Sequence, residues 1–118
     1  MIRSFHNYAK YSLWCQKEYE ELLDEQINNN EIVIVGLTWC PWTRRAKKLI
    51  KERYNKDPLI IAPDAVNENY KISVLQCMCK KTGTINVAQI WIKGEHIGDF
   101  EKLHKMHYRD QLNSKLFL

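Results

Sequence analysis

The chain has 118 residues, of which 18 are basic, 14 are acidic and 45% are hydrophobic. This length and apolar fraction suit one domain with one core, so we expect a single domain over residues 1–118. The net charge of +4 is spread along the chain and argues against a nucleic-acid groove. No apolar run approaches the roughly 20 residues of a membrane span, and the first residues lack the apolar stretch of a secretory signal. We therefore expect a soluble cytoplasmic protein, a mitochondrial location being the weaker alternative, with no nucleic-acid or membrane partner.

The four cysteines, at positions 15, 40, 77 and 79, are few for a domain stapled by disulfides. Reduced thiols are therefore expected. Cys77 and Cys79 lie two residues apart in a predicted helix and point to nearly opposite sides, so they can neither bond to each other nor share one metal ion. We interpret this pair as small buried fillers of the core.

The first predicted elements are a helix, a strand and a second helix. Apolar residues recur at helical spacing over about residues 5–27, and Asn28–Asn30 ends the pattern. Ile32–Val35 is a β-branched run, which is typical of a central strand covered on both faces. The helix that follows buries one face and exposes another, which carries Arg44, Arg45, Lys47, Lys48 and Lys51.

The second half of the chain predicts a strand, a helix, a hairpin and a last helix. A short strand at 59–62 follows Pro58, and a helix from about Glu68 ends at Thr82–Gly83. Residues 87–92 and 95–97 form a hairpin around the Lys93–Gly94 turn. The last helix begins near Asp99, a good N-cap residue, and continues past Leu112.

This order of elements predicts an α/β protein with three layers. A parallel crossover pair and an antiparallel hairpin can share one four-stranded mixed sheet flanked by helices, which is the thioredoxin-like topology. We assign its core to about residues 31–117, after an N-terminal helix at about 5–27.

Cys40 stands between the predicted central strand and the helix after it. In an open α/β sheet, ligands bind in the crevice at the carboxyl ends of the strands, and unpaired amides at a helix start favour negative charge. A thiolate is such a charge and is the form that attacks disulfides. Pro41 suits the first helical turn, and Arg44 adds positive charge one turn on. We predict that Cys40 is the reactive residue.

From Ile32 onward the chain resembles glutaredoxins in four segments, Trp39–Thr43, Thr82–Gly83, Val87–Gln89 and Lys93–Gly98. The spacing between the Cys-Pro pair and the hairpin makes this resemblance specific. It implies a thiol–disulfide oxidoreductase that uses glutathione. Thr43 stands where two-thiol members have a second cysteine, which implies a one-thiol deglutathionylation mechanism through Cys40. Thr43 can still donate a hydrogen bond to the thiolate.

The resemblance also implies which residues bind glutathione, and several of them depart from the family. The implied set is Val87, Ala88, Asp99, Phe100 and Glu101. Ala88 replaces the family's cis proline, so the bond before it is either trans or a cis bond that costs about 2.5–4 kcal/mol. Asp99 replaces a glycine at the start of the last helix, where its carboxylate can occupy the helix amides or repel the ligand.

The family's two other contacts with the glycyl carboxylate of glutathione are also altered. Its lysine falls at Leu37, and its helix glutamine falls at Leu75, one residue from Gln76. Arg44, Lys80 or Lys81 can replace the lost charge. The expected partners are glutathione and glutathionylated or disulfide-containing proteins.

Two alternative functions stay open. One-thiol glutaredoxins can hold a [2Fe–2S] cluster between two subunits, with Cys40 and glutathione as ligands, so the chain is expected to be a monomer, or a dimer if it binds a cluster. Apart from that role of Cys40 we expect no metal ligand, since we interpret His104 and His107 as part of a solvated face. The other alternative is a non-catalytic adaptor with the thioredoxin fold. Trp39 and Trp42, which flank Cys40, can form a stacking platform, although the helical phase of Trp42 favours packing.

Overall fold

The structure is a computed structural model that describes residues 13–118. These residues form a four-stranded sheet in the order β2-β1-β3-β4. The strands are β1 (Ile32–Val35), β2 (Leu59–Ile61), β3 (Gln89–Ile92) and β4 (Glu95–Gly98). β1 pairs in parallel with β2 and antiparallel with β3, and β3 pairs antiparallel with β4. The sheet is therefore mixed, as the order of elements predicts.

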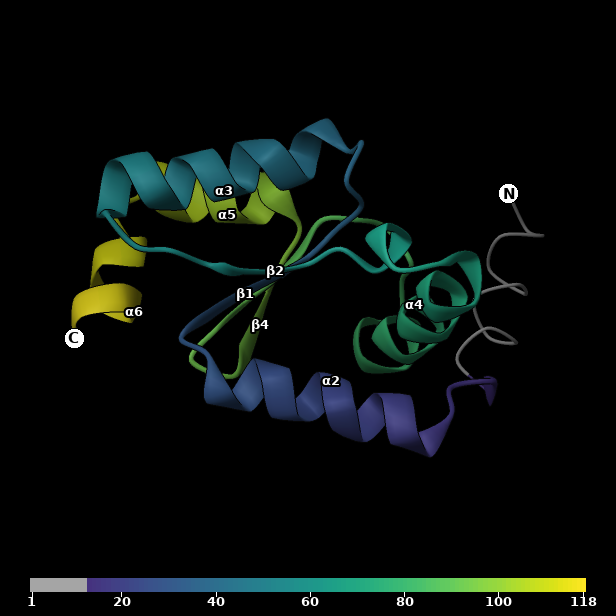
Figure 1. The fold of residues 1–118 in the computed structure, drawn as a ribbon. Helices are drawn as coiled ribbons and strands as arrows, with labels where there is room; N and C mark the ends of the chain where they lie inside the picture. The colour runs from purple at the N-terminus through teal and green to yellow at the C-terminus, as the bar shows by residue number, and fades with distance from the viewer. Residues whose placement is uncertain (1–12) are drawn as a thin grey trace.

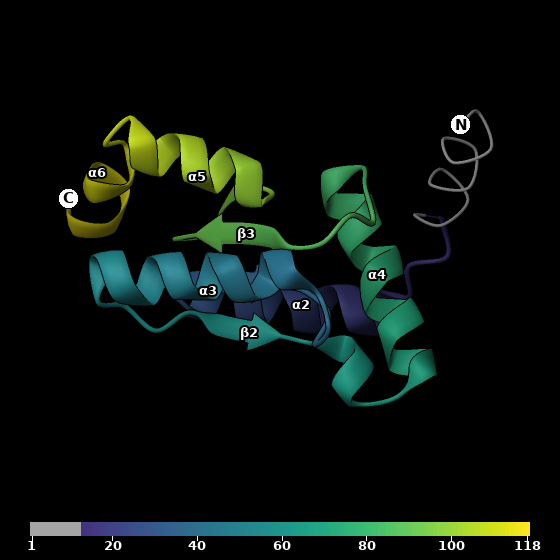
Figure 2. The ribbon, with the colours of Figure 1, turned by 90° about the horizontal axis from the view of Figure 1, so that it is seen from above.

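Helices cover both faces of the sheet (Figure 1). One side carries α3 (Pro41–Tyr54) and α5 (Phe100–Tyr108), and the other carries α2 (Lys17–Asn29) and α4 (Glu68–Thr82). The view in Figure 2 shows α3 and α5 running side by side along the sheet. A short 3₁₀ helix, η1 (Pro63–Ala65), precedes α4, and α6 (Leu112–Phe117) ends the chain.

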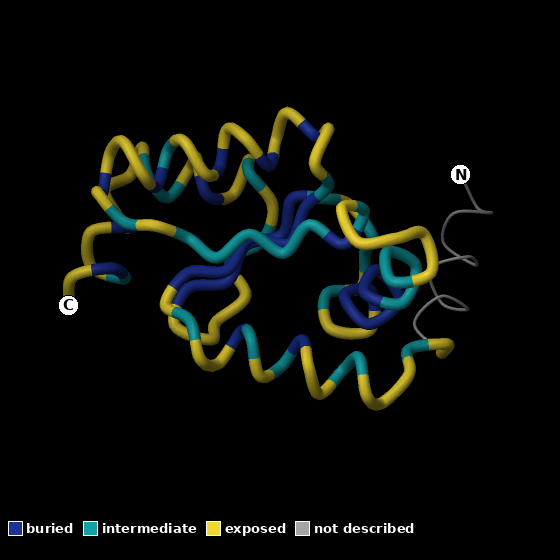
Figure 3. Tube along the Cα trace, viewed as in Figure 1, coloured by how far each residue is buried: buried dark blue, intermediate teal, exposed yellow. Residues whose placement is uncertain are grey.

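The core has two halves because the side chains of β1 alternate between the faces of the sheet. Ile32 and Ile34 belong to the half under α3 and α5, whereas Val33 and Val35 belong to the half under α2 and α4. All four side chains are at most 2% exposed. Figure 3 shows the strands of this buried centre between α2 and α3, whose outer turns are exposed, and a largely buried α4. The unbroken β-branched run in the sequence is thus explained by helices on both faces.

Local capping fixes where the helices begin and end. The Asn67 side chain accepts a hydrogen bond from the Tyr70 backbone N–H at the start of α4. Gly83 ends the same helix at φ +80°, a conformation in which glycine has no steric penalty. Asp99 caps α5 by accepting a hydrogen bond from the Lys102 N–H, which confirms its predicted role as an N-cap.

The helices at the two ends of the chain differ from the prediction. Within the described residues the N-terminal helix begins at Lys17, after a non-helical Cys15 and Gln16, and the rest of the predicted range 5–27 before residue 13 lies outside them. The prediction of a single last helix is wrong, because α5 ends at Tyr108 and α6 starts at Leu112. Asp110 adopts a left-handed φ of 58° between them, which no helix accommodates.

Two of the cysteines form a disulfide, so the expectation of four reduced thiols is wrong. Cys15, just before α2, is bonded to Cys77 in α4, and 62 residues separate them in sequence. Cys40 and Cys79 take part in no disulfide within the described chain, and both are buried. Cys77 and Cys79 do not bond to each other, as their helical spacing predicts. The disulfide joins the two helices that cover the same face of the sheet.

Among residues 13–118, no helix combines the length and apolar character needed to cross a bilayer.

Candidate active site

Cys40 occupies the N-cap position of α3, directly after the loop that leaves β1. Its backbone is extended, and its N–H donates a 3.1 Å hydrogen bond to the Leu37 carbonyl oxygen. Pro41 begins the helix, as predicted. The cysteine is only 3% exposed, and its Sγ lies 3.9 Å from the Val87 carbonyl oxygen. The fold therefore brings together two residues that are 47 positions apart in the chain.

The segment beside the thiol has a cis peptide bond between Val87 and Ala88. Ala88 is 1% exposed and packs into the core half under α3 and α5, whereas Val87 is partly exposed. Of the two predicted ligand-binding residues, only Val87 therefore presents a surface to a ligand. The alanine belongs to the core and does not line the pocket.

Two consecutive hydrogen bonds, from His96 to Gln89 and from Gln89 to Asn86, hold the segment that contains the cis bond. The buried Gln89 side chain donates from Nε2 to the Asn86 carbonyl oxygen at 2.9 Å. Its Oε1 lies 2.8 Å from His96 Nε2, so that ring nitrogen is the donor. Desolvation lowers the pKa of His96, which favours the neutral ring. His96 thus has a supporting contact that its position in the hairpin did not predict.

A pocket of about 560 Å³ opens next to the Val87 segment. Four of the five residues predicted to bind glutathione line it; they are Val87, Asp99, Phe100 and Glu101. Its wall is completed by Trp42, one of the two residues of the possible stacking platform, and by Asn86 and His104, which were not predicted to bind the ligand. Asn86 directly precedes the predicted ligand-binding residue Val87, whereas His104 carries no signal in the sequence, because it reaches the site only when α5 packs beside α3. The volume lies within the range of small-ligand sites, about 300–1,000 Å³.

Asp99 uses one helix amide and leaves others at the start of α5. Its Oδ1 accepts from the Lys102 N–H at 3.0 Å, so the carboxylate does not bond to the Phe100 or Glu101 N–H groups. Glu101, the second acid of the pocket, lies 3.5 Å from Lys105 Nζ on the same helix. The pocket therefore offers unused amides together with two carboxylates.

Thr43 is buried but does not contact the thiol through a hydrogen bond. Within residues 13–118, Thr43 Oγ1 is the one buried side-chain oxygen or nitrogen that has no hydrogen-bond partner. The predicted hydrogen bond from Thr43 to Cys40 is therefore wrong. The side chain packs against Gly36 instead, where a Cβ added to the glycine would lie 2.1 Å from Thr43 Oγ1. Only glycine leaves room for the threonine here.

Of the three cations predicted to replace the family lysine that falls at Leu37, only Arg44 is still available for a ligand. Lys80 pairs with Glu20 and Lys81 pairs with Asp24, so α2 holds both lysines. Arg44, one turn after Cys40, is exposed and forms no ion pair within the described chain.

Asp64 anchors the loop before Cys40. Its carboxylate accepts hydrogen bonds from the Thr38 N–H at 3.1 Å and from the Thr38 hydroxyl at 2.6 Å. These bonds stabilise the ionised form and hold the pKa of Asp64 below its usual value. Sequence reasoning missed this contact, which joins a loop to η1 across 26 residues.

Aromatic rings run from the pocket along α5. Trp42 lies 5.7 Å from Phe100, and Phe100 lies 5.7 Å from His104, measured between ring centroids. Trp42 thus contacts Phe100 but is 46% exposed, so the packing predicted for it is only partial, and Trp39 is 67% exposed. The interpretation of both histidines as solvated is wrong for His107, which is hydrogen-bonded to the buried Tyr54 hydroxyl.

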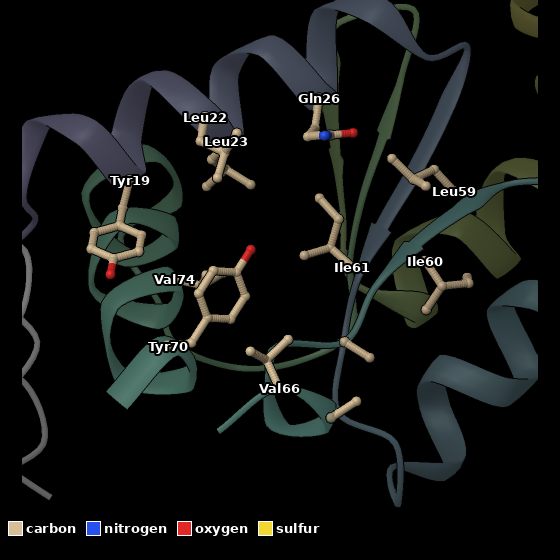
Figure 4. Close-up of a pocket in the computed structure, with 12 residues that line it drawn as sticks. Tyr19, Leu22, Leu23, Gln26, Leu59, Ile60, Ile61, Val66, Tyr70 and Val74 are labelled. Carbon is tan, nitrogen blue, oxygen red and sulfur yellow. The ribbon is translucent and has the colours of Figure 1, made fainter. Parts of the chain in front are cut away.

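A second hollow of about 380 Å³ lies on the opposite side of the sheet (Figure 4). It is lined mainly by apolar residues from α2, β2, η1 and α4, and Tyr70 points into it. None of the predicted site residues lines it. Within residues 13–118 there is also no group of three or more His, Cys, Asp or Glu residues that could hold a metal ion. Cys40 is therefore a single cysteine ligand within one chain, and the cluster shared by two subunits stays a prediction.

A central sheet with a cysteine at the N-terminus of the first core helix defines the thioredoxin-fold class. Solved structures confirm this fold. The buckwheat glutaredoxin–glutathione complex matches with a TM-score of 0.78 and 24% identity, covering 85% of this chain and 88% of the other. Glutaredoxin C1 from Populus tremula x tremuloides matches with a TM-score of 0.77 and 19% identity, over 85% and 96% of the two chains.

Curated relatives identify the family. A glutaredoxin of Pseudomonas aeruginosa is 33% identical over 72% of this chain and 94% of its own length. The chloroplastic monothiol glutaredoxin-S12 of Arabidopsis thaliana is 29% identical over 82% of this chain, which spans about half (53%) of that relative's length. No family model matches the chain. The chain belongs to the glutaredoxin family.

Proposed function

We propose that the protein is a glutathione-dependent thiol–disulfide oxidoreductase that works through Cys40 alone. In the first step the Cys40 thiolate attacks the glutathione sulfur of a mixed disulfide. A Cys40–glutathione disulfide forms, and the substrate thiolate leaves and takes a proton from solvent. In the second step a glutathione thiolate attacks the same sulfur, which releases glutathione disulfide and restores Cys40. One reduced glutathione is consumed for each substrate, and the disulfide bond passes from the substrate through Cys40 to glutathione disulfide.

The observation that carries this proposal is the position of the Cys40 sulfur. It lies at the N-terminus of α3, 3.9 Å from the carbonyl oxygen of Val87, which lines the 560 Å³ pocket. A group bonded to this sulfur can therefore extend into the pocket. The buckwheat relative of similar fold was solved as a complex with glutathione, which supports glutathione as the ligand.

The neighbours of Cys40 support the one-thiol step. Thr43 replaces a second thiol, and the other cysteines lie in or next to α4, with Cys15 and Cys77 bonded to each other. Burial raises the pKa of the Cys79 thiol, which disfavours its thiolate.

The pocket residues have distinct proposed roles. Val87 aligns the cysteinyl part of glutathione along its backbone, and the Phe100 N–H receives the γ-glutamyl carboxylate. The Glu101 carboxylate binds the ammonium group, while Arg44 lies on the side of the thiol where the glycyl carboxylate is expected.

The test is intact mass after incubation with glutathione disulfide. Wild type and Cys79→Ser are expected to gain about 305 Da, the mass of one glutathione joined through a disulfide, and to lose it again with reduced glutathione. Cys40→Ser should gain nothing. A folded wild-type protein without an adduct at Cys40 would overturn the proposal and favour the adaptor function.

The same preparation tests the cluster alternative. A [2Fe–2S] protein is brown on purification and loses its colour in Cys40→Ser. A colourless monomer that accepts glutathione supports the proposed enzyme, acting on glutathionylated proteins in the cytoplasm.

A further inference from the structure

We propose that the exposed face of α3 is the docking surface for the protein half of the substrate, and that it selects acidic segments. This inference rests on the proposed function, because the substrate must be a mixed disulfide placed at Cys40. The observation that supports the inference is a stripe of four cationic side chains on α3. They are Arg44, Lys47, Lys48 and Lys51.

The four cations occupy one face of the helix. Their spacing of i, i+3, i+4 and i+7 places neighbouring side chains on adjacent turns of the same face. All four are exposed, and only Lys51 has an ion pair within residues 13–118, with Asp57 at 3.3 Å. Glu52 is the one acidic residue in α3. Three of the four cations, Arg44, Lys47 and Lys48, therefore have no ion-pair partner within residues 13–118.

This arrangement weakens the helix that carries it. Like charges at i,i+3 and i,i+4 repel each other, and the stripe contains four such pairs. The N-terminal end of α3 favours negative charge, so Arg44 in its first turn is also unfavourable there, whereas Lys51 in the last turn is not. Glutathione accounts for Arg44 in the proposed function, and the remaining cations of the stripe are explained by a second anionic partner.

The position of the stripe points to the substrate protein as that partner. With a rise of 1.5 Å per residue, the cations lie about 6–16 Å from Cys40 along the helix axis. They are turned at least about 120° around the helix from Trp42, which lines the glutathione pocket. When glutathione fills the pocket, the protein half of the disulfide must leave the sulfur over another surface. Trp39, exposed in the loop before Cys40, and the stripe flank that route.

Charge complementarity then defines the substrate class. The favoured substrates are glutathionylated proteins whose modified cysteine lies within a few residues of several Asp or Glu side chains. Attraction between exposed charges acts over about 10 Å at 0.1 M salt, which matches the distance from the stripe to Cys40.

The experiment uses three glutathionylated peptides that differ only in a three-residue extension of Glu, Gln or Lys. For wild type at low salt we expect kcat/KM to be about tenfold higher for the Glu peptide than for the Lys peptide, and the ratio to fall toward one in high salt. Lys47→Gln/Lys48→Gln should reduce this ratio about threefold. The charge-matched control Arg53→Gln/Lys93→Gln, which leaves the stripe intact, should keep the ratio of wild type.

Two further measurements separate this proposal from the proposed function. Turnover of the mixed disulfide of glutathione and 2-mercaptoethanol reports the chemistry alone and should be equal in wild type and both double variants. Fluorescence anisotropy of the same three peptides with Cys40→Ser reports docking without turnover, and the Glu peptide should bind most tightly. Equal binding and equal kcat/KM for the three peptides, or an equal loss in the control variant, overturns the docking surface. If wild type does not turn over the small mixed disulfide, the proposed function is overturned. The anisotropy measurement then decides by itself whether the docking surface exists.

Discussion

Gly36 and Thr43 show how closely the residues around Cys40 pack. Gly36 directly follows β1 and is buried, and Thr43 lies in the first turn of α3. A Cβ on Gly36 would lie 2.1 Å from Oγ1, 2.7 Å from Cγ2 and 2.9 Å from Cβ of Thr43. The first turn of α3 therefore packs directly against the backbone of Gly36. This contact positions Cys40 as well.

Gly36→Ala is expected to lower the free energy of unfolding by about 1–3 kcal/mol, because the added methyl group overpacks a buried contact. It should also slow formation of the Cys40–glutathione adduct, since α3 must shift. Urea unfolding and intact mass measure the two effects. A matched alanine at the surface residue Asn69 should change neither of them. A stability equal to that of wild type would mean that the contact is looser than the structure shows.

Asp64 gives the loop before Cys40 a dependence on pH. Its pKa is lower in the folded state than in the unfolded chain, because the ionised carboxylate accepts the Thr38 hydrogen bonds. The stability it contributes is therefore present above the unfolded value of about 3.9 and is lost as pH falls through the lower folded value. Unfolding measured from pH 6 to pH 2.5 should show a steeper loss for wild type than for Asp64→Asn. Parallel curves would contradict the role of this carboxylate.

At the scale of elements, α5 depends on a residue that also lines the site. Asp99 caps the helix through the Lys102 N–H and places a carboxylate in the glutathione pocket. The family resemblance predicts this conflict, and the structure shows its geometry. A substitution that keeps the cap and removes the charge separates the two roles.

Asp99→Asn is expected to leave stability nearly unchanged, because Asn is an equally good N-cap. Without the like charge, KM for glutathione should fall by about fivefold, the equivalent of about 1 kcal/mol, which is the repulsion between unit charges about 4 Å apart in water. Asp99→Ala should instead lose about 1 kcal/mol of stability. Thermal unfolding and steady-state kinetics measure these effects. An unchanged KM in Asp99→Asn would show that the ligand carboxylate lies elsewhere.

The disulfide is the covalent link between α2 and α4. Closing a loop of about 60 residues restricts the unfolded chain, so Cys15→Ser should reduce the free energy of unfolding by about 2–4 kcal/mol. Wild type treated with a strong reductant should show the same loss, and Cys15→Ser should be insensitive to that reductant. If reductant leaves the unfolding curve of wild type unchanged, the disulfide contributes no stability.

At the scale of the whole molecule, periodic features could be predicted from sequence. The Ile32–Val35 run, the helix caps and the hairpin turn each have a local signature, and together they specify the sheet order. The position of Cys40 follows from them, since it lies where a strand meets a helix. The identity of its ligand came from resemblance and not from these patterns.

Contacts between distant residues left no such signature. Cys15–Cys77 and Thr38–Asp64 join positions far apart in the chain, and either partner alone looks like an ordinary surface or helix residue. The break between α5 and α6 was missed because it contains neither glycine nor proline, the usual signals for a helix end. Asn86 and His104 became site residues only through packing.

The disulfide has a practical consequence for anyone who handles the protein. Glutathione, the reductant of the proposed reaction, also opens protein disulfides by exchange. A sample purified without thiols has Cys15 bonded to Cys77, whereas a sample kept in concentrated reduced glutathione can lose that bond during the assay itself. The two samples then contain covalently different forms of the same sequence. Each form has its own shelf life, protease resistance and melting point. Comparisons between preparations require that the thiol content of the buffer be stated.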